Sequence, residues 1–302
     1  MWTRHLFLKL SANSTLRRWM ESSPHARHLT ERFIAGETLE QELDVCANLE
    51  QQGVWAALDH LGESVTTLDE AAQSAEAYVA ALDGIAARKL ASVVSIKITQ
   101  FGVDLSPAAC LANVVRVVEK GKSIGSRVEI DMESSRYTDR TLYIAEQASA
   151  LGPVRCVIQA YLHRSRADVE RMNRLRIPVR LCKGAYDEPV TVAFPSKADV
   201  DEHYLQLMRT LLDDGTYPAI ATHDPRMLEA TTAYALERGI SADRFEFQML
   251  YGIRRDLQRK LVEQGYRLRL YVPYGTAWYP YFMRRLAERP ANVFFLVRNL
   301  FH

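Results

Sequence analysis

The chain has 302 residues, of which 48% are hydrophobic and 25% are charged, a composition typical of a globular protein with one large domain or two small ones. Its 38 basic and 37 acidic residues give a net charge of +1, so it has no global attraction for polyanions and we expect no nucleic-acid partner. The four cysteines form no Cys-x-x-Cys pair, which argues against a zinc knuckle or a disulfide framework, and no apolar run of about eighteen residues predicts a membrane span.

Residues 1–52 are predicted to form an N-terminal helical arm. Apolar residues recur at helical spacing through residues 6–20, and again through residues 39–49 after a stop at Gly36. The residues before Glu21 carry only basic charges, which we interpret as a basic first helix. An organellar transit peptide is the alternative interpretation of this basic segment.

From Val54 onward, short β-prone runs alternate with longer amphipathic stretches. The predicted strands are residues 54–58, 93–98, 128–132, 154–161, 178–182, 219–222, 245–250 and 268–272. The predicted helices are residues 68–90, 107–120, 139–151, 166–175, 197–212, 225–238, 253–264 and 276–289. This alternation predicts parallel strands that are buried on both faces.

Strand–helix units over residues 54–289 fit a (β/α)8 barrel, which usually takes about 250 residues. A doubly wound open sheet is the competing topology. However, no G-x-G-x-x-G or G-x-x-x-x-G-K-[ST] motif follows any predicted strand. We therefore predict an α/β barrel domain over residues 53–302 with a short C-terminal tail.

Polar side chains recur near the C-terminal ends of the predicted strands, where a barrel enzyme carries its active site. They are Lys97, Asp131, Gln159, Arg180, Lys183, His223, Gln248 and Tyr271. Each has a structural explanation: Lys97 and Asp131 could form a buried ion pair, the glutamines could be hydrogen-bonded core groups, and His223 could cap the next helix. Their recurrence at one end of successive strands favours a functional site.

The last predicted helix carries Tyr281, Arg284, Arg285 and Glu288 on one face. The turn-forming residues 272–275 before it could fold this helix over the barrel mouth. Two arginines there would bind a carboxylate or phosphate through bidentate hydrogen bonds, whereas on a solvated face they would have no such role. We therefore expect a barrel enzyme that acts on a small anionic substrate.

The residues leave three kinds of chemistry open. Lys97 or Lys183 could be the Schiff-base nucleophile of a lyase. Asp131, His223 and Asp224 could bind a metal ion for hydrolysis, although only one histidine stands at a strand end. The barrel lining could instead hold an organic redox cofactor.

Seven stretches of the chain resemble, in order and with similar spacing, the proline dehydrogenase family. They are SIKITQFG, EIDMES, VIQAY, VRLCKGAYDEP, ATHDP, FEFQMLYG and YVPYGTAWYPYFMRRLAE. The resemblance runs from about Gly36 to Phe295 and is strongest to the short monofunctional bacterial enzymes. The combination of KGAY with the Y-x-x-R-R-x-x-E helix is highly specific for this family.

This resemblance implies a distorted (β/α)8 TIM barrel whose final helix folds over the mouth and which binds FAD without a Rossmann fold. It implies oxidation of L-proline to Δ1-pyrroline-5-carboxylate by hydride transfer to FAD, the first step of proline degradation to glutamate. Electrons would pass to a membrane quinone. We accordingly expect a cytoplasmic protein with peripheral association at the inner face of the membrane, and a separate pyrroline-5-carboxylate dehydrogenase as a partner.

The family motifs also imply roles for individual residues. Arg284 and Arg285 would bind the proline carboxylate with help from Lys97. Tyr271 and Tyr281 would pack against the proline ring. Glu288 would orient the final helix. The catalytic candidates are Arg180, beside the flavin N5, and Asp131, which would pair with the site lysine. The residues implied to contact FAD are Met132, Gln159, Arg180, Lys183, Gly184, Ala185, Thr222, His223 and Gln248. The alternatives are a Schiff-base lyase and a non-catalytic protein that senses proline or docks on a membrane.

Overall fold

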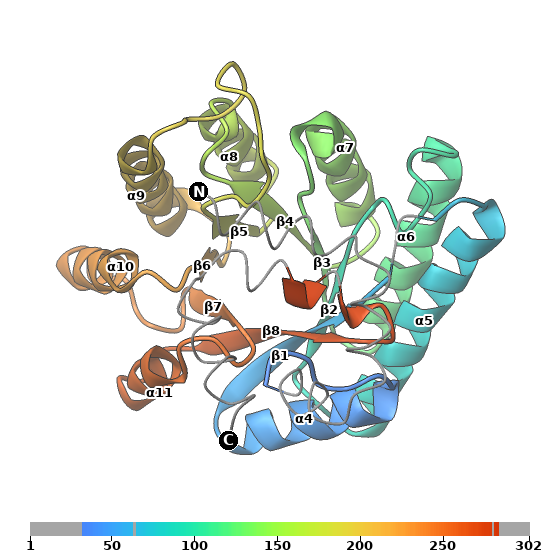
Figure 1. Ribbon diagram of the computed structural model, residues 1–302. Coiled ribbons are helices and arrows are strands. Elements are labelled where there is room, and N and C mark those ends of the chain that lie inside the picture. Colours follow the sequence, from blue (N-terminus) through green and yellow to red (C-terminus); the bar gives the residue numbers. More distant parts are fainter. Residues whose placement is uncertain (1–31, 63–64, 280, 284–302) are drawn as a thin grey trace.

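A closed barrel of parallel strands forms the centre of the protein (Figure 1). The computed structural model describes residues 32–62, 65–279 and 281–283. The strands follow one another around the barrel in chain order: β1 Val54–His60, β2 Val93–Ile96, β3 Val128–Ile130, β4 Val154–Gln159, β5 Val179–Cys182, β6 Ala219–Ala221, β7 Glu246–Leu250 and β8 Leu268–Tyr274. Pairing of β8 with β1 along the whole of both strands closes the barrel. The predicted α/β class and (β/α)8 topology are confirmed.

Helices surround the barrel on its outer side (Figure 1). They are α4 Leu39–Gln51, α5 Leu68–Ala87, α6 Pro107–Ser123, α7 Thr138–Ser149, α8 Ser165–Arg174, α9 Lys197–Asp214, α10 Pro225–Glu237 and α11 Arg255–Glu263. The helix starts follow their sequence signals, since the Ser106 and Asp224 side chains accept backbone hydrogen bonds at the start of α6 and α10. The helix α6 continues past its predicted end at Lys120, and the left-handed Gly125 (φ +71°) follows it.

The helix α4 lies in the described part of the predicted arm, residues 32–52. It contacts β1 and β8, and it places Leu43, Cys46 and Leu49 in the main hydrophobic core. Burial of such side chains stabilises the fold by about 1.5–3 kcal/mol each. The division into an arm (1–52) and a barrel domain (53–302) stays a prediction, because residues 1–31 lie outside the described residues.

Part of the predicted last helix belongs to a second hydrophobic cluster. Residues 278–279 and 281–283 are helical, and Phe282 packs against Phe33 with the ring centroids 6.0 Å apart. Ile253, which precedes α11, also lies in this cluster. The cluster therefore brings the chain near Phe33 against the segment that follows β8.

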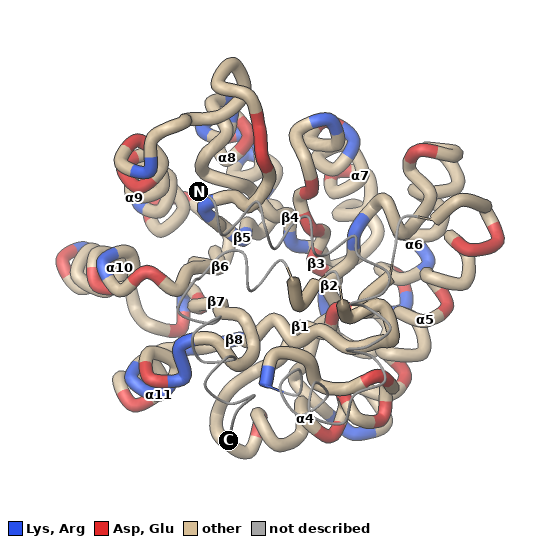
Figure 2. The backbone as a smooth tube through the Cα atoms, viewed as in Figure 1, with Lys and Arg blue, Asp and Glu red and all other residues tan. Residues whose placement is uncertain are grey.

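Most charged residues lie on the outer helices, but several lie on strands inside the ring (Figure 2). The strands are otherwise apolar and buried. A charged group inside such a core is strongly destabilising unless an opposite charge and hydrogen bonds compensate it. The interior charges therefore indicate a specific network.

Glu42 of α4 is a buried carboxyl group outside that network. Its side chain is fully buried, its Oε1 accepts a weak hydrogen bond from Cys46 at 3.7 Å, and its Oε2 has no hydrogen-bond partner among the described residues. Burial raises the pKa of Glu42 well above its ordinary value, and the nearby Asp59 carboxyl group adds to this effect. Glu42 therefore favours its neutral, protonated form in the folded protein.

We expect the Glu42→Gln variant to lose part of the pH dependence of stability. In the unfolded chain Glu42 ionises near pH 4.3, while the folded state keeps the proton, so folding becomes less favourable as pH rises above about 4.3 by up to ~1.4 kcal/mol per unit. Urea unfolding at a series of pH values measures this slope. Glu119→Gln, at an exposed position of α6, is the control. If the pH slope of stability is the same in Glu42→Gln as in Glu119→Gln, Glu42 does not keep its proton in the folded protein.

Candidate active site

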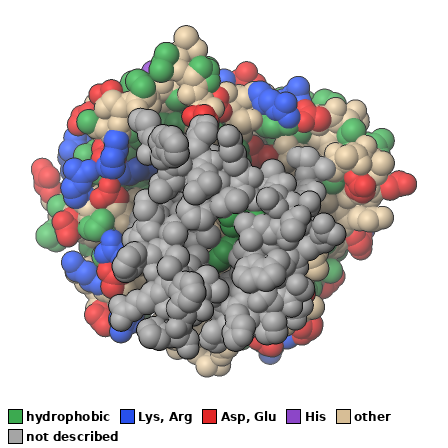
Figure 3. Space-filling view, in the orientation of Figure 1, with side chains coloured by type: hydrophobic (Ala, Val, Ile, Leu, Met, Phe, Trp, Pro, Cys, Tyr) green, Lys and Arg blue, Asp and Glu red, His purple; other side chains and the backbone are tan. Residues whose placement is uncertain are grey.

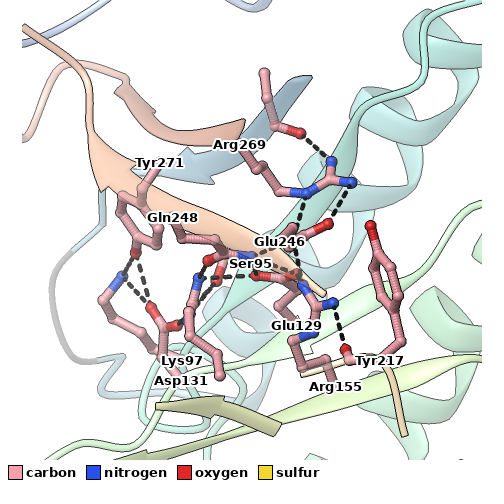
Figure 4. Close-up of polar contacts among 12 residues, drawn as sticks. Ser95, Lys97, Glu129, Asp131, Arg155, Tyr217, Glu246, Gln248, Arg269 and Tyr271 are labelled. Atoms are coloured by element: carbon pink, nitrogen blue, oxygen red, sulfur yellow. Dashed lines mark hydrogen bonds and ion pairs between the residues drawn. The ribbon is translucent and has the colours of Figure 1, made fainter. Parts of the chain in front are cut away.

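Four polar side chains converge at the C-terminal ends of β1, β2, β3 and β8. Lys97 Nζ donates hydrogen bonds to Asp59 Oδ1 at 2.7 Å and to the Tyr271 hydroxyl at 2.9 Å, and it lies 3.4 Å from Asp131 Oδ2. The Tyr271 hydroxyl in turn donates to Asp131 Oδ2 at 2.7 Å (Figure 4). Lys97 and Asp131 follow directly on β2 and β3, so the ends of these adjacent strands bring them together.

The electrostatics of this group keep Lys97 charged and Tyr271 neutral. Burial favours the neutral amine, but the Asp59 and Asp131 carboxylates outweigh it and raise the pKa of Lys97 above its ordinary value. Burial, reinforced by Asp131, raises the pKa of Tyr271 well above its usual range. The barrel mouth therefore holds a fixed ammonium group and a neutral phenol.

The buried Arg180 of β5 contacts this group through Asp131. Its guanidinium donates to Glu129 Oε2 at 2.8 Å, to Ser95 Oγ at 3.0 Å and to Gln248 Oε1 at 3.1 Å, and it forms an ion pair with Asp131. Burial opposes its charge, but Asp131 and Glu129 outweigh burial and raise the pKa of Arg180. Its orientation is fixed by partners on β2 and β7 and on or directly after β3.

Asp131 connects the two cations. Burial alone would raise the pKa of Asp131, but Arg180 and Lys97 outweigh burial and lower it below its ordinary value. Asp131 is therefore a carboxylate at neutral pH. Its Oδ2 lies near Lys97 and its Oδ1 pairs with Arg180, so one carboxylate holds both cations in position.

Side chains of alternating charge continue from this group through the barrel interior (Figure 4). In order they are Asp59, Lys97, Asp131, Arg180, Glu129, Arg155, Glu246 and Arg269, which we call the interior charge row. Arg155 lies 2.6 Å from Glu129 and 2.5 Å from Glu246, and Arg269 lies 3.0 Å from Glu246. The row contains as many cations as anions, so each buried charge has an opposite neighbour.

Three residues predicted to contact a cofactor are hydrogen-bonded to one another. The Gln159 amide at the end of β4 donates to the Met132 carbonyl at 3.4 Å and accepts from the Ala185 backbone N–H at 3.3 Å. Gly184, which precedes Ala185, has φ +124°, and a Cβ at this position would lie 2.2 Å from the Tyr161 ring. Only glycine therefore lets the loop after β5 pass so close to β4.

Lys183 lies in a second charged cluster at the C-terminal ends of β5 and β6. Its Nζ is 2.8 Å from Asp224 Oδ2 and also pairs with Asp201, which binds Lys197 and Arg226 as well. Lys and Arg side chains of this part of the molecule are visible over α9 and α10 at the left of Figure 3. Three cations share two carboxylates, so the cluster keeps one surplus positive charge.

His223 and Thr222 lie at the end of β6 and connect it to β7. The Leu250 backbone N–H donates to His223 Nε2 at 2.8 Å, and the Thr222 backbone N–H donates to the Gln248 carbonyl at 3.2 Å. The cap of α10 is Asp224 rather than His223, so the capping alternative for His223 is wrong. Both residues remain candidates for ligand contact.

The structure brings together some predicted site residues and separates others. Lys97, Asp131, Arg180 and Tyr271 form one hydrogen-bonded group. The Gln248 side chain is only 3% exposed and is bonded to the interior charge row. Tyr281 is buried in the second hydrophobic cluster, while Arg284, Arg285 and Glu288 lie outside the described residues.

The sequence interpretation missed five charged members of the interior row. They are Asp59, Glu129, Arg155, Glu246 and Arg269. A signal was present in segments such as VEI, FEF and LRL, in which a single charged residue stands between apolar ones. Because alternate residues of a barrel strand face inward, this pattern places the charge inside the barrel.

Two further findings on the described residues concern metal ligands and membrane-spanning helices. Within residues 32–62, 65–279 and 281–283, no group of three or more His, Cys, Asp or Glu side chains is arranged to hold a metal ion. None of the helices described is long and apolar enough to cross a membrane.

The chain is similar to known proteins over almost its whole length. It matches the model of the family described as proline dehydrogenase over residues 43–298. It is 41% identical over 298 residues to proline dehydrogenase 1 of Bacillus subtilis, and the alignment covers 98% of each chain. It is 40% identical over 282 residues to the proline dehydrogenase of Deinococcus radiodurans, which covers 90% of each chain.

A larger solved protein contains a similar fold. The structure of proline utilization A from Bdellovibrio bacteriovorus, inactivated by N-propargylglycine, superposes with a TM-score of 0.82 and 26% sequence identity. The alignment covers 87% of this chain and 33% of that one. The chain thus spans about a third of that protein but nearly all of the two bacterial relatives.

Proposed function

The chain belongs to the proline dehydrogenase family, and from this premise we propose that it oxidises L-proline to Δ1-pyrroline-5-carboxylate by hydride transfer to FAD. The observation that carries the proposal is the group at the barrel mouth, where Asp131 holds a protonated Lys97 and a buried Arg180. A fixed pair of cations suits a reaction in which a substrate carboxylate must be bound and negative charge develops nearby.

The described residues fit a flavin dinucleotide. The Gly184 backbone has no Cβ that would block a close approach, and Gln159 and Ala185 present polar groups next to it. The surplus positive charge around Lys183 suits a pyrophosphate. We propose that FAD is held by Met132, Gln159, Arg180, Lys183, Gly184, Ala185, Thr222, His223 and Gln248. Bound there, it would supply the hydride acceptor of the reaction.

The substrate side of the site must bind a carboxylate while leaving the amine neutral. A hydride can leave the carbon next to nitrogen only when the nitrogen lone pair is free. We propose that Lys97, together with Arg284 and Arg285 of the last predicted helix, binds the carboxylate of proline. Arginine keeps its proton throughout and therefore neutralises the carboxylate without protonating the amine. Tyr271 and Tyr281 would form the walls of the pocket, and Glu288 would orient the last helix.

Arg180 would stabilise the negative charge that develops on the acceptor when it receives the hydride from the substrate. Its orientation is set before the reaction by Glu129 and Asp131, so no reorganisation is needed when the charge appears. The same carboxylates prevent the guanidinium from rotating toward solvent. Asp131 thereby acts on both cations of the site.

This geometry favours redox chemistry over a Schiff-base lyase. A lysine nucleophile must be deprotonated, whereas Asp59 and Asp131 raise the pKa of Lys97 against the effect of burial. Lys183 is likewise engaged in two ion pairs. Neither lysine is placed as a free amine.

We further propose the destination of the electrons and of the product. The resemblance supports a membrane quinone as electron acceptor, with peripheral association of this protein at the inner face of the cytoplasmic membrane. It also supports a separate pyrroline-5-carboxylate dehydrogenase that consumes the product on the way to glutamate.

The visible absorption spectrum tests the proposed function directly. We expect the purified protein to be yellow and to bleach when L-proline is added without oxygen, whereas D-proline serves as the control. A folded, flavin-free preparation that FAD cannot reconstitute would contradict the proposal. An adduct trapped by borohydride with a carbonyl substrate would support the lyase instead, and tight proline binding without turnover would support a binding protein.

A further inference from the structure

A cavity lies at the end of the barrel opposite to the candidate active site. It has a volume of about 680 Å³, and its lining includes Trp55, Arg127, Tyr217, Arg267 and Arg269. These residues lie at or just before the N-terminal ends of β1, β3, β6 and β8. In Figure 4, Arg269 and Tyr217 lie at the far end of the interior charge row from Lys97. Since catalytic residues of such barrels lie at the C-terminal ends, the proline site does not account for this cavity.

The lining of this cavity is strongly cationic. It contains Lys89, Arg127, Arg267 and Arg269, and no Asp or Glu is among the lining residues. Arg269 is paired with Glu246, but Lys89, Arg127 and Arg267 form no ion pair with any residue that the structure describes. Three positive charges of the lining therefore have no direct ion-pair partner among the described residues.

Arg127 is the most constrained of these cations. Its Nε is buried and has no hydrogen-bond partner among the described residues. Burial, together with the like charge of Arg155, lowers the pKa of Arg127 to about 10, although Glu129 and Glu246 oppose this effect. An anion in the cavity would compensate Arg127 both for its lost hydration and for the repulsion by Arg155.

Aromatic rings hold the guanidinium groups in place. The Arg267 Cζ lies 5.5 Å from the Trp55 ring centroid and 5.7 Å from that of Tyr217, and the Arg127 Cζ lies 5.6 Å from the Tyr217 centroid. Tyr217 itself has φ +46°, a left-handed conformation that bulky residues rarely adopt. These cation–π contacts restrain the guanidinium groups. Arg267 Nη1 also donates to the Tyr217 hydroxyl at 3.3 Å, so Nε and Nη2 form the edge that Arg267 can offer to a ligand.

The nearest carboxylates do not neutralise this surface. Glu129 and Glu246 belong to the interior charge row and are paired with Arg155 and Arg269. The Asp243 backbone carbonyl accepts a hydrogen bond from Arg267 at 2.8 Å. A hydrogen bond with Ser241, together with the charge of Arg267, lowers the pKa of the Asp243 carboxyl group, but the Asp243 and Arg267 side chains, both described, form no ion pair. Glu50 accepts hydrogen bonds from the Ala91 backbone N–H.

We propose that this cavity is an anion site that binds a small multivalent oxyanion of the phosphate class through Arg127 and Arg267. Two guanidinium forks can each form paired hydrogen bonds with a tetrahedral oxyanion, and Lys89 adds a third positive charge. The volume leaves room for an organic group attached to the phosphate. The ligand is therefore either an inorganic phosphate or a phosphorylated small molecule, and the experiment distinguishes these sources.

Thermal unfolding of the protein as purified tests the site. We expect inorganic phosphate and pyrophosphate to raise the melting temperature saturably by about 2 to 5 °C over sodium chloride of equal ionic strength. Calorimetric titration gives the affinities. Adenosine monophosphate is the third ligand: tighter binding than phosphate identifies a phosphorylated organic ligand, and weaker binding identifies the inorganic ion.

Variants locate the effect in the cavity. Arg127→Gln and Arg267→Gln are each expected to weaken phosphate binding at least about tenfold, the effect of losing about 1.4 kcal/mol of interaction. Arg209→Gln is the matched control, because Arg209 is exposed on α9 and also lies over a tyrosine ring, that of Tyr234, at 5.8 Å. If no anion exceeds the effect of chloride, or if both cavity variants respond as Arg209→Gln does, the proposal is overturned. Arg267→Gln alone decides the question if Arg127→Gln does not fold.

Discussion

Replacing Lys97 with methionine should lower kcat/KM for L-proline by a factor of about 10² to 10³. Methionine keeps much of the side-chain volume but removes the cation that Asp59 and Asp131 hold at the barrel mouth. Asp59 would then lose its ion-pair partner, and Asp131 would keep only Arg180. Steady-state kinetics with an artificial dye as electron acceptor measure the loss.

The pH dependence of this loss provides a second readout. Because Asp59 and Asp131 raise the pKa of Lys97, the ammonium is present across the neutral range and the deficit of Lys97→Met should stay constant from about pH 6 to pH 9. Lys120→Met is the control, since Lys120 pairs with Asp83 on the outer helices. Equal kcat/KM values for the two variants would mean that Lys97 does not bind the substrate.

Replacing Arg155 with leucine should destabilise the protein by about 3–5 kcal/mol. Arg155 is fully buried and lies between Glu129 and Glu246, so its removal leaves two buried carboxylates short of a positive partner. Its guanidinium also donates to the Tyr217 carbonyl at 3.1 Å, a hydrogen bond that leucine cannot form. The midpoint of urea unfolding measures the effect.

Arg116→Leu is the control for this experiment. Arg116 forms an ion pair with Glu76, but their side chains are 52% and 60% exposed. Solvent screens such a pair, so its loss should change the free energy of unfolding by less than about 1 kcal/mol. Similar losses in both variants would mean that the buried Glu129 and Glu246 carboxylates do not depend on Arg155 for compensation.

The interior charge row explains how Arg180, for which we propose a catalytic role, can remain fixed in an otherwise apolar barrel. A buried ion pair seldom adds net stability, because removing two charges from water costs about as much as their attraction returns. Its benefit here is orientation, since Glu129 and Asp131 hold Arg180 from two sides. Such support is what keeps an active-site group in its productive position.

Most of the fold could be predicted from local patterns. Each predicted strand overlaps an observed one, because buried parallel strands appear as short β-prone runs between amphipathic helices. The ends were less accurate. The helix predicted from Ile253 starts at Arg255, since Ile253 packs into the second hydrophobic cluster and Arg254 adopts a left-handed conformation with φ +55°. Such ends depend on what each residue packs against.

The candidate site was predictable only where a polar residue stood out in its own segment. Lys97, Asp131 and Arg180 stand out in this way, and the structure places them together. The five missed charges also interrupt apolar strands, but a strand does not reveal which charge lies across the barrel from it. Glu129 of β3 and Glu246 of β7 meet at Arg155 of β4 because the barrel closes around them.

The amino-acid pattern alone was sufficient for the alternation of strands and helices, the barrel topology and the family resemblance, because these depend on residues close together in the chain. The order of the interior charge row and the cationic cavity at the opposite end became apparent only in three dimensions. Arg127, Tyr217 and Arg267 precede three different strands, and closure of the barrel brings their side chains into one cavity. Contacts between such distant segments arise from packing, and local sequence patterns do not encode them.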